Sequence, residues 1–350
     1  MLQTTHSRSL VFAVLLFGLV LASAGVLIQT VNVLLLILAG LLFGIFVNGI
    51  SSWLAERTPL PYTGSYLIVV LSMLILGGLG FYYLGSQTVQ RASQLGSELQ
   101  SAGDKAIGQL DQVGVSEKSL KQSFNIEKVL SDQGKSALMS LLSGMRSVGA
   151  GITAAFVILF VGLYAAYEPS LYRTGMLKLV PMSKRDRAEE VLMQLREALS
   201  GWIIGRLMSM AIVGVLTSIG LAVLGIPLPV TLGVLAALLT FIPNFGPLLA
   251  ALPQVLLALN IGTDTVVYVV VFNLALQGIE SYVITPMIQR HEVTLPPILT
   301  IAAQLLMGIV IGLVGVMMAA PLVVVIMVIV QMLYVEDELG DPNPGSLTGS

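Results

Sequence analysis

Long apolar runs separated by polar breaks dominate this sequence and restrict what the chain can fold into. A helix needs about 20 predominantly apolar residues to cross a bilayer core about 30 Å thick. Simple runs of about that length lie at 10–28, 33–50, 66–85, 148–167, 202–224 and 266–285. Only 10% of the 350 residues are charged, against about 25% in soluble domains, so too few charged side chains remain to solvate a globule of this size. We therefore predict an all-α, polytopic helical membrane protein.

The N-terminal region, residues 1–85, is predicted to hold three transmembrane helices. Only Gln29, Thr30 and Asn32 interrupt the first two runs, which predicts an antiparallel helical hairpin. Arg8, an apolar run and the small residues Leu21-Ala22-Ser23-Ala24 also imitate a secretory signal peptide. The length of the run and the second run that follows at once favour a retained helix.

Two polar stretches interrupt the apolar pattern. Residues 86–147 carry seven Lys/Arg and six Asp/Glu, with apolar residues spaced as on an amphipathic helix. Such a helix lies on the membrane surface or on its own domain, or it packs against a neighbouring protomer. Residues 183–201, with apolar residues on one face and Trp202 at the end, predict an interfacial amphipathic helix.

The basic residues of short loops predict the orientation of the chain. Arg8, Arg57 and the basic cluster within 173–196 are consistent with a cytoplasmic position, which places residues 86–147 outside the cytoplasm. Segments of about 60 residues cross a membrane largely regardless of charge. Both termini are then cytoplasmic. As separate regions, we expect residues 148–334 to form a transport core and 335–350 to form an acidic disordered tail.

The stretch Pro229–Leu259 is too long for one perpendicular span and short for two. Its middle contains Pro243, Asn244, Gly246 and Pro247. Each proline removes an amide donor and disfavours a continuing helix. The stretch is either a long kinked helix or a discontinuous, re-entrant hairpin at a transport site, and the two prolines around an Asn-Phe-Gly tip favour the hairpin.

The stretch Pro297–Tyr334 is similarly long and contains Gly308, Gly312 and Gly315. Each of these two stretches follows a simple span, Trp202–Leu224 or Val266–Thr285. If each stretch dips into the membrane and returns to its own side, the two units have opposite topology. We therefore expect about eight membrane segments, two of them broken, with an inverted repeat as a hypothesis.

Polar residues inside the spans are the candidate lining of a solute pathway. Asn273, Gln277 and Glu280 share one face of a helix. They either hold the bundle together through interhelical hydrogen bonds or line a path for a polar solute, with Glu280 able to carry a proton. Arg206 is a candidate counter-charge for Glu280, unless it extends to the membrane interface. Three further candidates complete the substrate pathway: Asn244, Gln254 and Gln304.

Composition disfavours several other classes of protein. The net charge of −2 lacks the basic face that nucleic acid requires. Without cysteine, and with His6 and His291 far apart, the sequence indicates no metal site. No His or Lys falls within a span to activate a hydroxyl nucleophile, so we expect neither an intramembrane enzyme nor a cofactor.

The second half of the sequence resembles the autoinducer-2 exporter family of bacterial permeases. The resemblance covers about Gly151–Leu333 and depends on the order of several short motifs. These are Leu179-Val-Pro181, Gly201-Trp-Ile-Ile-Gly205, Leu224-Gly-Ile-Pro227, Ile242-Pro-Asn-Phe-Gly-Pro247, Gln277-Gly-Ile-Glu280, Ile284-Thr-Pro286, Leu295-Pro-Pro297 and Ala320-Pro321.

The resemblance implies about eight membrane segments, a homo-oligomer such as a pentamer, and export of a small polar metabolite across the bacterial inner membrane. Autoinducer-2 is the type substrate, and quorum sensing is the process that it serves. Some relatives resemble sodium/proton antiporters, in which Glu280 would be the titrating group. A membrane scaffold that assembles partners through residues 86–147 is the alternative of another class.

Overall fold

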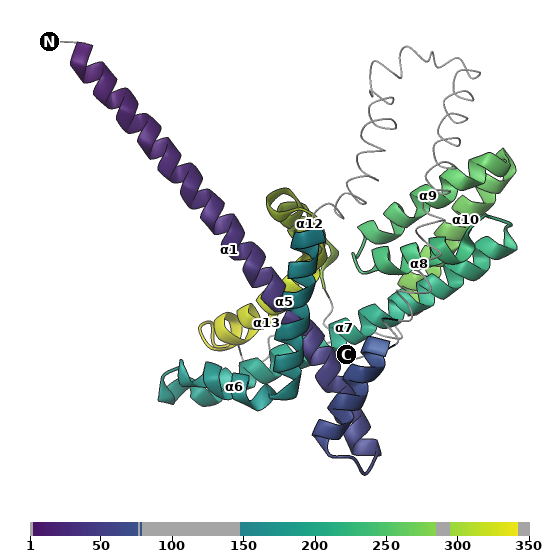
Figure 1. Cartoon of the computed structure of the whole chain (residues 1–350), viewed down its shortest axis with the longest axis horizontal. Coiled ribbons are helices and arrows are strands. Elements are labelled where there is room, and N and C mark those ends of the chain that lie inside the picture. Colours follow the sequence, from purple (N-terminus) through teal and green to yellow (C-terminus); the bar gives the residue numbers. More distant parts are fainter. Residues whose placement is uncertain (1–2, 76–77, 79–147, 285–294, 342–350) are drawn as a thin grey trace.

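The computed structural model describes residues 3–75, 78, 148–284 and 295–341 (Figure 1). For 3–28 and 148–152 only the helical backbone is described. Every regular element within these ranges is a helix, and four helices are long and apolar enough to cross a membrane, or five if one bent pair counts as a single span. The predicted all-α, polytopic membrane fold is confirmed. The polar segment 86–147 lies outside the described residues, and its helix stays a prediction.

The first element, α1, is one continuous helix from Gln3 to Arg57 (Figure 1). Its 55 residues correspond to a length of about 80 Å. The predicted hairpin between the first two runs is therefore wrong. The polar residues Gln29, Thr30 and Asn32 lower the hydropathy of the chain, but none of them breaks a helix as Pro or Gly does.

The C-terminal part of α1 crosses α5 (Val148–Tyr167) at a close contact between small residues. A Cβ added at Gly44 would lie 2.9 Å from the carbonyl oxygen of Gly162, and one added at Gly162 would lie 2.7 Å from that of Gly40. Glycine at these positions lets two membrane helices approach backbone to backbone. A short apolar helix, Tyr62–Ile75, packs against the same pair and occupies part of the third predicted span.

The helix α6 (Pro169–Lys178) follows α5 after a bend of 90° at Glu168. Pro169 at the first helical position starts the new helix and disfavours a helical Glu168. The next long helix, α7 (Arg185–Val223), is continuous and follows a short 3₁₀ turn, η2 (Met182–Lys184). The predicted interfacial helix 183–201 is therefore not a separate element but the first half of α7. Gly201 is tolerated inside the helix and makes no break.

The stretch around Pro243 is a helical hairpin of α8 (Pro229–Thr240) and α9 (Phe245–Ile261). The two helices pack against each other and α9 packs against α10 (Thr263–Ile279), which continues into a π-helical turn, η3 (Glu280–Ile284). One buried cluster joins Leu221 of α7, Leu232 of α8, Leu257 of α9 and Val269 of α10. The hairpin, rather than the kinked helix, is present in the structure.

The second broken stretch consists of α12 (Pro297–Ile311) and α13 (Leu313–Ile329), which pack against each other. The break is the single residue Gly312, with φ 80° and ψ −149°. Glycine is nearly the only residue that adopts this conformation. Each hairpin thus follows a helix that is long and apolar enough to cross a membrane, Met182–Val223 or Thr263–Ile284. The inverted relation between the two units stays a prediction.

The chain continues from α13 into a π-helix, η5 (Val330–Glu336). Arg187 of α7 holds this end through the Met332 carbonyl at 2.9 Å and the Glu336 carboxylate at 2.6 Å, and through an ion pair with Asp337 at 3.0 Å. The tail predicted as disordered from residue 335 is therefore ordered to residue 341. An arginine 150 residues earlier in the chain supplies the contacts, which composition alone does not reveal.

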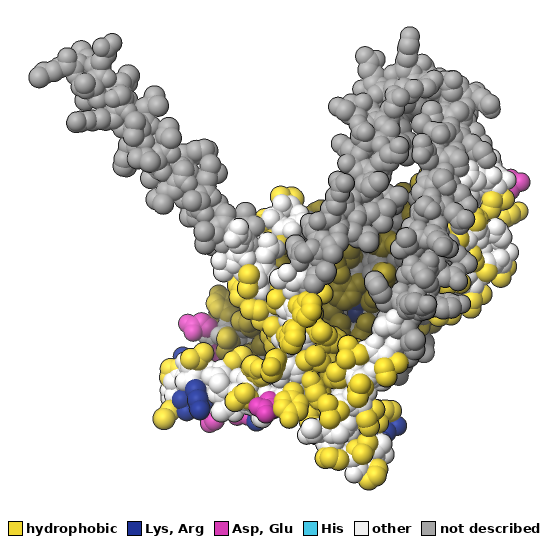
Figure 2. All heavy atoms as spheres, in the orientation of Figure 1, with side chains coloured by type: hydrophobic (Ala, Val, Ile, Leu, Met, Phe, Trp, Pro, Cys, Tyr) yellow, Lys and Arg dark blue, Asp and Glu magenta, His cyan; other side chains and the backbone are white. Residues whose placement is uncertain are grey.

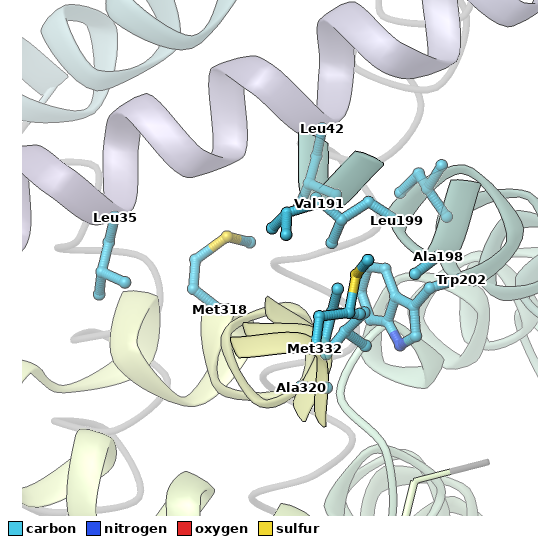
Figure 3. Packing of buried hydrophobic residues seen from close by; sticks show 12 residues of the cluster. Leu35, Leu42, Val191, Ala198, Leu199, Trp202, Met318, Ala320 and Met332 are labelled. Atoms are coloured by element: carbon cyan, nitrogen blue, oxygen red, sulfur yellow. The ribbon is translucent and has the colours of Figure 1, made fainter. Parts of the chain in front are cut away.

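The largest buried cluster lies where α1, the first half of α7, and α13 meet. Figure 3 shows Leu35 and Leu42 of α1 extending toward Met318 of α13 and toward Val191 and Leu199 of α7. These helices are distant in sequence, and their packing fixes the first half of α7 relative to α1 and α13. The second half of α7 then extends to the α8–α10 group (Figure 1).

Candidate functional site

The turn between α8 and α9, Phe241–Asn244, is the most irregular backbone at any predicted site residue. Asn244 has φ 66° and ψ −48°, and the Phe245 amide donates to the Pro243 carbonyl at 2.8 Å. This is a γ-turn with a positive φ at its central residue, a rare and strained form. Gly246 opens α9 where its backbone contacts Leu239 of α8, with no room for a Cβ.

The turn leaves two backbone carbonyls without their helical partners. The Phe245 amide bonds to Pro243 instead of Phe241, and Pro247 has no amide hydrogen to donate to Pro243. Arg206 Nε of α7 donates to the Phe241 carbonyl at 3.2 Å. Gln304 Nε2 of α12 donates to the Pro243 carbonyl at 2.9 Å. Side chains from two other helices therefore satisfy the carbonyls that the prolines and the γ-turn release.

Gln304 is 1% exposed, and its amide is oriented by the bond to Pro243. A carbonyl can only accept a hydrogen bond, so the nitrogen of the amide faces Pro243. The amide oxygen of Gln304 is then buried without a hydrogen-bond partner in the described part of the chain. An acceptor in this position can receive a hydroxyl or amine hydrogen from a bound molecule, and leaving it unpaired costs about 1–3 kcal/mol.

A second polar contact lies along the pair α9 and α10. Asn273 Nδ2 donates to Gln254 Oε1 at 2.9 Å and to the Val269 carbonyl of its own helix, also at 2.9 Å. Gln254 is 1% exposed. Both of these predicted site residues are thus brought together, and their contact crosses between helices.

Glu280 is 7% exposed and lies where α10 changes to the π-helical η3. The guanidinium of Arg206 is its electrostatic partner, which is one of the two roles that the sequence left open for Arg206, and Arg206 also bonds to Phe241. Gln277 is different: it is exposed, and its bond is to Ser281 of the same helix at 3.4 Å. The three residues predicted to share one helix face therefore differ in exposure. Asn273 and Glu280 are directed into the protein, and Gln277 is exposed.

The ten predicted residues fall on six parts of the fold. Pro243 and Asn244 form the turn, Gly246, Pro247 and Gln254 lie on α9, Asn273 and Gln277 on α10, Glu280 on η3, Gln304 on α12 and Arg206 on α7. Arg206 and Gln304 meet at the turn, and Glu280 interacts with Arg206. Among the described residues, no group of three or more His, Cys, Asp or Glu side chains could hold a metal ion.

A second polar network was missed by the sequence analysis. Arg196 Nη2 of α7 donates to Asn48 Oδ1 of α1 at 2.6 Å, and Asn48 Nδ2 donates to the Tyr62 hydroxyl at 2.7 Å. Tyr62 donates in turn to the Ala166 carbonyl of α5. The available signal was Asn48 itself, a polar residue near the end of an apolar run. The network joins four helices away from the α8–α9 turn.

Comparisons with known proteins agree with this architecture. The family description "AI-2E family transporter" matches residues 10–334. "Putative transport protein YrrI" of Bacillus subtilis is 31% identical over 187 residues, which is 53% of each chain. "Putative transport protein MT0215" of Mycobacterium tuberculosis is 25% identical over 317 residues, 88% of this chain and 86% of the relative. The Escherichia coli K12 protein "Putative transport protein YhhT" is 22% identical over 298 residues, 83% of this chain and 82% of the relative.

The first of these alignments spans about half of the relative's length, whereas the family match covers nearly the whole of this chain. The helical fold and its several apolar spans are consistent with a multi-pass membrane transporter. The chain belongs to the AI-2E family of transporters.

Proposed function

We propose that this chain is a bacterial inner-membrane permease that exports a small polar metabolite resembling autoinducer-2, or facilitates its passage. The family match supports membrane transport, and the family description supports the choice of autoinducer-2 as the first solute to test. A homo-oligomer such as a pentamer, with both termini of each protomer in the cytoplasm, belongs to the same proposal.

The observation that supports the proposal is the gathering of polar groups at the α8–α9 turn. Arg206 of α7 and Gln304 of α12 donate to backbone carbonyls of the turn, and the charge of Arg206 interacts with that of Glu280 on η3. Irregular backbone is tolerated in a membrane where it is buried in protein or lines a wet cavity. Broken helices of this kind form the substrate sites of many secondary transporters.

The geometry favours a neutral, hydroxyl-bearing solute over a simple ion. The charges of Arg206 and Glu280 offset each other, and the group left available is the neutral amide oxygen of Gln304. A site that hydrogen-bonds a substrate hydroxyl strongly rejects analogues that lack it. The amide of Gln304 is therefore the group that would select the solute.

A sodium/proton antiporter is the second candidate, because Glu280 is a buried carboxylate on a membrane helix with one basic partner. Intramembrane carboxylates of this kind form proton relays in pumps and transporters. In this mechanism Glu280 exchanges a proton for the transported cation, and flux follows the pH gradient.

Flux into proteoliposomes distinguishes the two mechanisms. Labelled autoinducer-2 and sodium are measured separately, with and without an imposed pH gradient, for the wild type, Glu280→Gln and the control Glu197→Gln on the exposed face of α7. If the proposal is right, autoinducer-2 flux does not depend on the pH gradient and is retained in Glu280→Gln. Sodium flux that follows the gradient and is lost in Glu280→Gln, but not in Glu197→Gln, would replace it with the antiporter.

A further inference from the structure

The short helix α6 (Pro169–Lys178) has no buried side chain among its ten residues. It bends by 90° from α5, whose 20 residues make about 30 Å of helix, the thickness of a bilayer core. A helix perpendicular to a membrane-crossing helix lies parallel to the membrane plane (Figure 1). An isolated helix of this length is marginal in water, so its surroundings determine whether it forms.

The exposed apolar residues of α6 share one face. At about 100° per residue, Leu171, Gly175, Leu179, Tyr172 and Met176 fall within an arc of about 140°, in that order around the helix. Leu171 is 60% exposed and Leu179, which caps the helix, is 87% exposed. The link to α7 continues this surface with Met182, which is 81% exposed. Such apolar exposure, contiguous on one face, indicates a surface covered by something other than water.

Basic residues lie at both borders of this apolar face. On the same helical wheel Arg173 follows Met176 on one side, and Lys178 precedes Leu171 on the other. Lys178 and Lys184 are exposed, and neither forms an ion pair within the described part of the chain. Arg173 pairs with Glu189 of α7 at 3.2 Å. Figure 2 shows blue and magenta side chains gathered at the end of the molecule that carries α6.

We propose that α6 and the link 179–184 form an interfacial anchor that binds the negatively charged headgroups of phospholipids. The apolar face enters the boundary between headgroups and acyl chains, while the flanking lysines extend to the phosphates. Lipid is the occupant that fits, because the helix lies in the membrane plane and because the exposed Lys178, at one edge of the apolar face, and Lys184, in the link, add positive charge beside that face. The inference does not depend on which solute is transported.

The depth of α6 can be measured in the full chain, since the sequence contains no cysteine. Leu179→Cys places a nitroxide label on the apolar face, and Thr174→Cys places one on the opposite, exposed face as the matched control. The expected result in vesicles is that oxygen reaches the label at 179 better than a water-soluble nickel complex does, and that the order reverses at 174. Equal aqueous accessibility at both positions would overturn the anchor, and so would a label at 179 near the bilayer midplane.

Lipid selectivity is tested in vesicles of phosphatidylcholine with an equal fraction of brominated phosphatidylcholine or brominated phosphatidylglycerol. A fluorophore at Leu179→Cys should be quenched more by the anionic lipid. Each lysine near a charged surface adds about a fivefold preference, so replacing both Lys178 and Lys184 with Gln should remove most of the difference. Thr174→Gln in the same background is the control with the charges intact. Equal quenching by both lipids with the lysines present would contradict the proposal.

Discussion

The two helical hairpins, α8–α9 and α12–α13, meet the same physical requirement in different ways. Each reverses the chain inside an apolar segment, where backbone groups without partners are costly. The α12–α13 break is one residue, Gly312, and the Gly312 amide still donates to Gly308 at 2.9 Å. The α8–α9 break contains the γ-turn at Asn244 and uses Arg206 and Gln304 from other helices as donors.

The difference shows how an irregular turn can create a site. At the glycine break, the amide of Gly312 and the amide of Val316 keep local helical hydrogen bonds. The α8–α9 turn releases carbonyls, and their donors bring a guanidinium and an amide from two other helices to the turn. We infer that the α8–α9 hairpin contacts the solute. The α12–α13 hairpin supplies Gln304, which bonds to the α8–α9 turn.

The largest expected effect is one that both hairpins share. An added Cβ at Gly246 would overlap the Leu239 carbonyl, and one at Gly315 would overlap the Met307 carbonyl. We expect Gly246→Ala and Gly315→Ala each to lower the free energy of unfolding by about 3 kcal/mol, measured by thermal unfolding in detergent. Gly262→Ala is the control, because nothing lies within 4 Å of its added Cβ. A loss confined to one hairpin would show that only that one is tightly packed.

The next effect separates the two breaks by backbone conformation. Gly312 has open space around an added Cβ but a φ of 80°, so Gly312→Ala should cost about 2 kcal/mol of stability through strain alone. Asn244→Gly should instead stabilise the α8–α9 turn by about 1 kcal/mol, because glycine adopts a positive φ without a steric penalty. Effects of opposite sign on the thermal unfolding of the two variants would support the comparison. If Gly312→Ala leaves the thermal stability unchanged, residue 312 does not have the positive φ of 80° described above.

Gln304→Leu tests the hydrogen bond from Gln304 of α12 to the Pro243 carbonyl, which connects the two hairpins. It removes the Gln304 bond to the Pro243 carbonyl, which keeps the γ-turn bond from the Phe245 amide. We expect a loss of about 1.5 kcal/mol in stability together with reduced solute flux in proteoliposomes. Thr300→Val on the same face of α12 is the control, since the Thr300 hydroxyl bonds only at 3.3 Å to Pro296 of its own helix. Normal flux and stability in Gln304→Leu would mean that the turn does not depend on the hydrogen bond from Gln304.

The smallest effect is the contact between Gln254 and Asn273, at 2.9 Å. A double-mutant cycle with Gln254→Leu and Asn273→Leu should give a coupling energy of about 0.6 kcal/mol, the average for hydrogen bonds between membrane helices. Additive effects of the two substitutions on unfolding would show that the contact contributes nothing specific.

Elements marked by proline were predictable from the sequence, and elements that depend on continuity were not. Pro243 and Pro247 indicated the α8–α9 hairpin because they remove donors locally. In contrast, α1 and α7 each join two predicted segments, since a drop in hydropathy at Gln29 or a charged stretch before Trp202 leaves the helix intact. The amphipathic pattern of 183–201 predicted a separate interfacial helix, but most of these residues form the first half of α7. The signal for α6 was Pro169 after Glu168, a common helix start.

The members of the candidate site were predictable, but most of their partners were not. A polar residue inside an apolar run can be seen in the sequence, and Asn244, Gln254, Glu280 and Gln304 were recognised in this way. Which group each one contacts depends on tertiary packing, because Arg206 and Gln304 reach the turn across 35 and 61 residues. Gln277 was assigned to the pathway by its spacing alone and lies at an exposed position.

The central claim, that the α8–α9 turn lines an aqueous solute pathway, is tested most directly by thiol accessibility. The sequence has no cysteine, so Asn244→Cys and the control Leu248→Cys, whose residue is 66% exposed on the outer face of α9, each present one thiol in vesicles. We predict that a water-soluble thiol reagent modifies position 244 at least tenfold faster than position 248, and that autoinducer-2 slows the reaction at 244 alone. Equally slow modification at both positions would place the turn in lipid or in packed protein and would contradict the account.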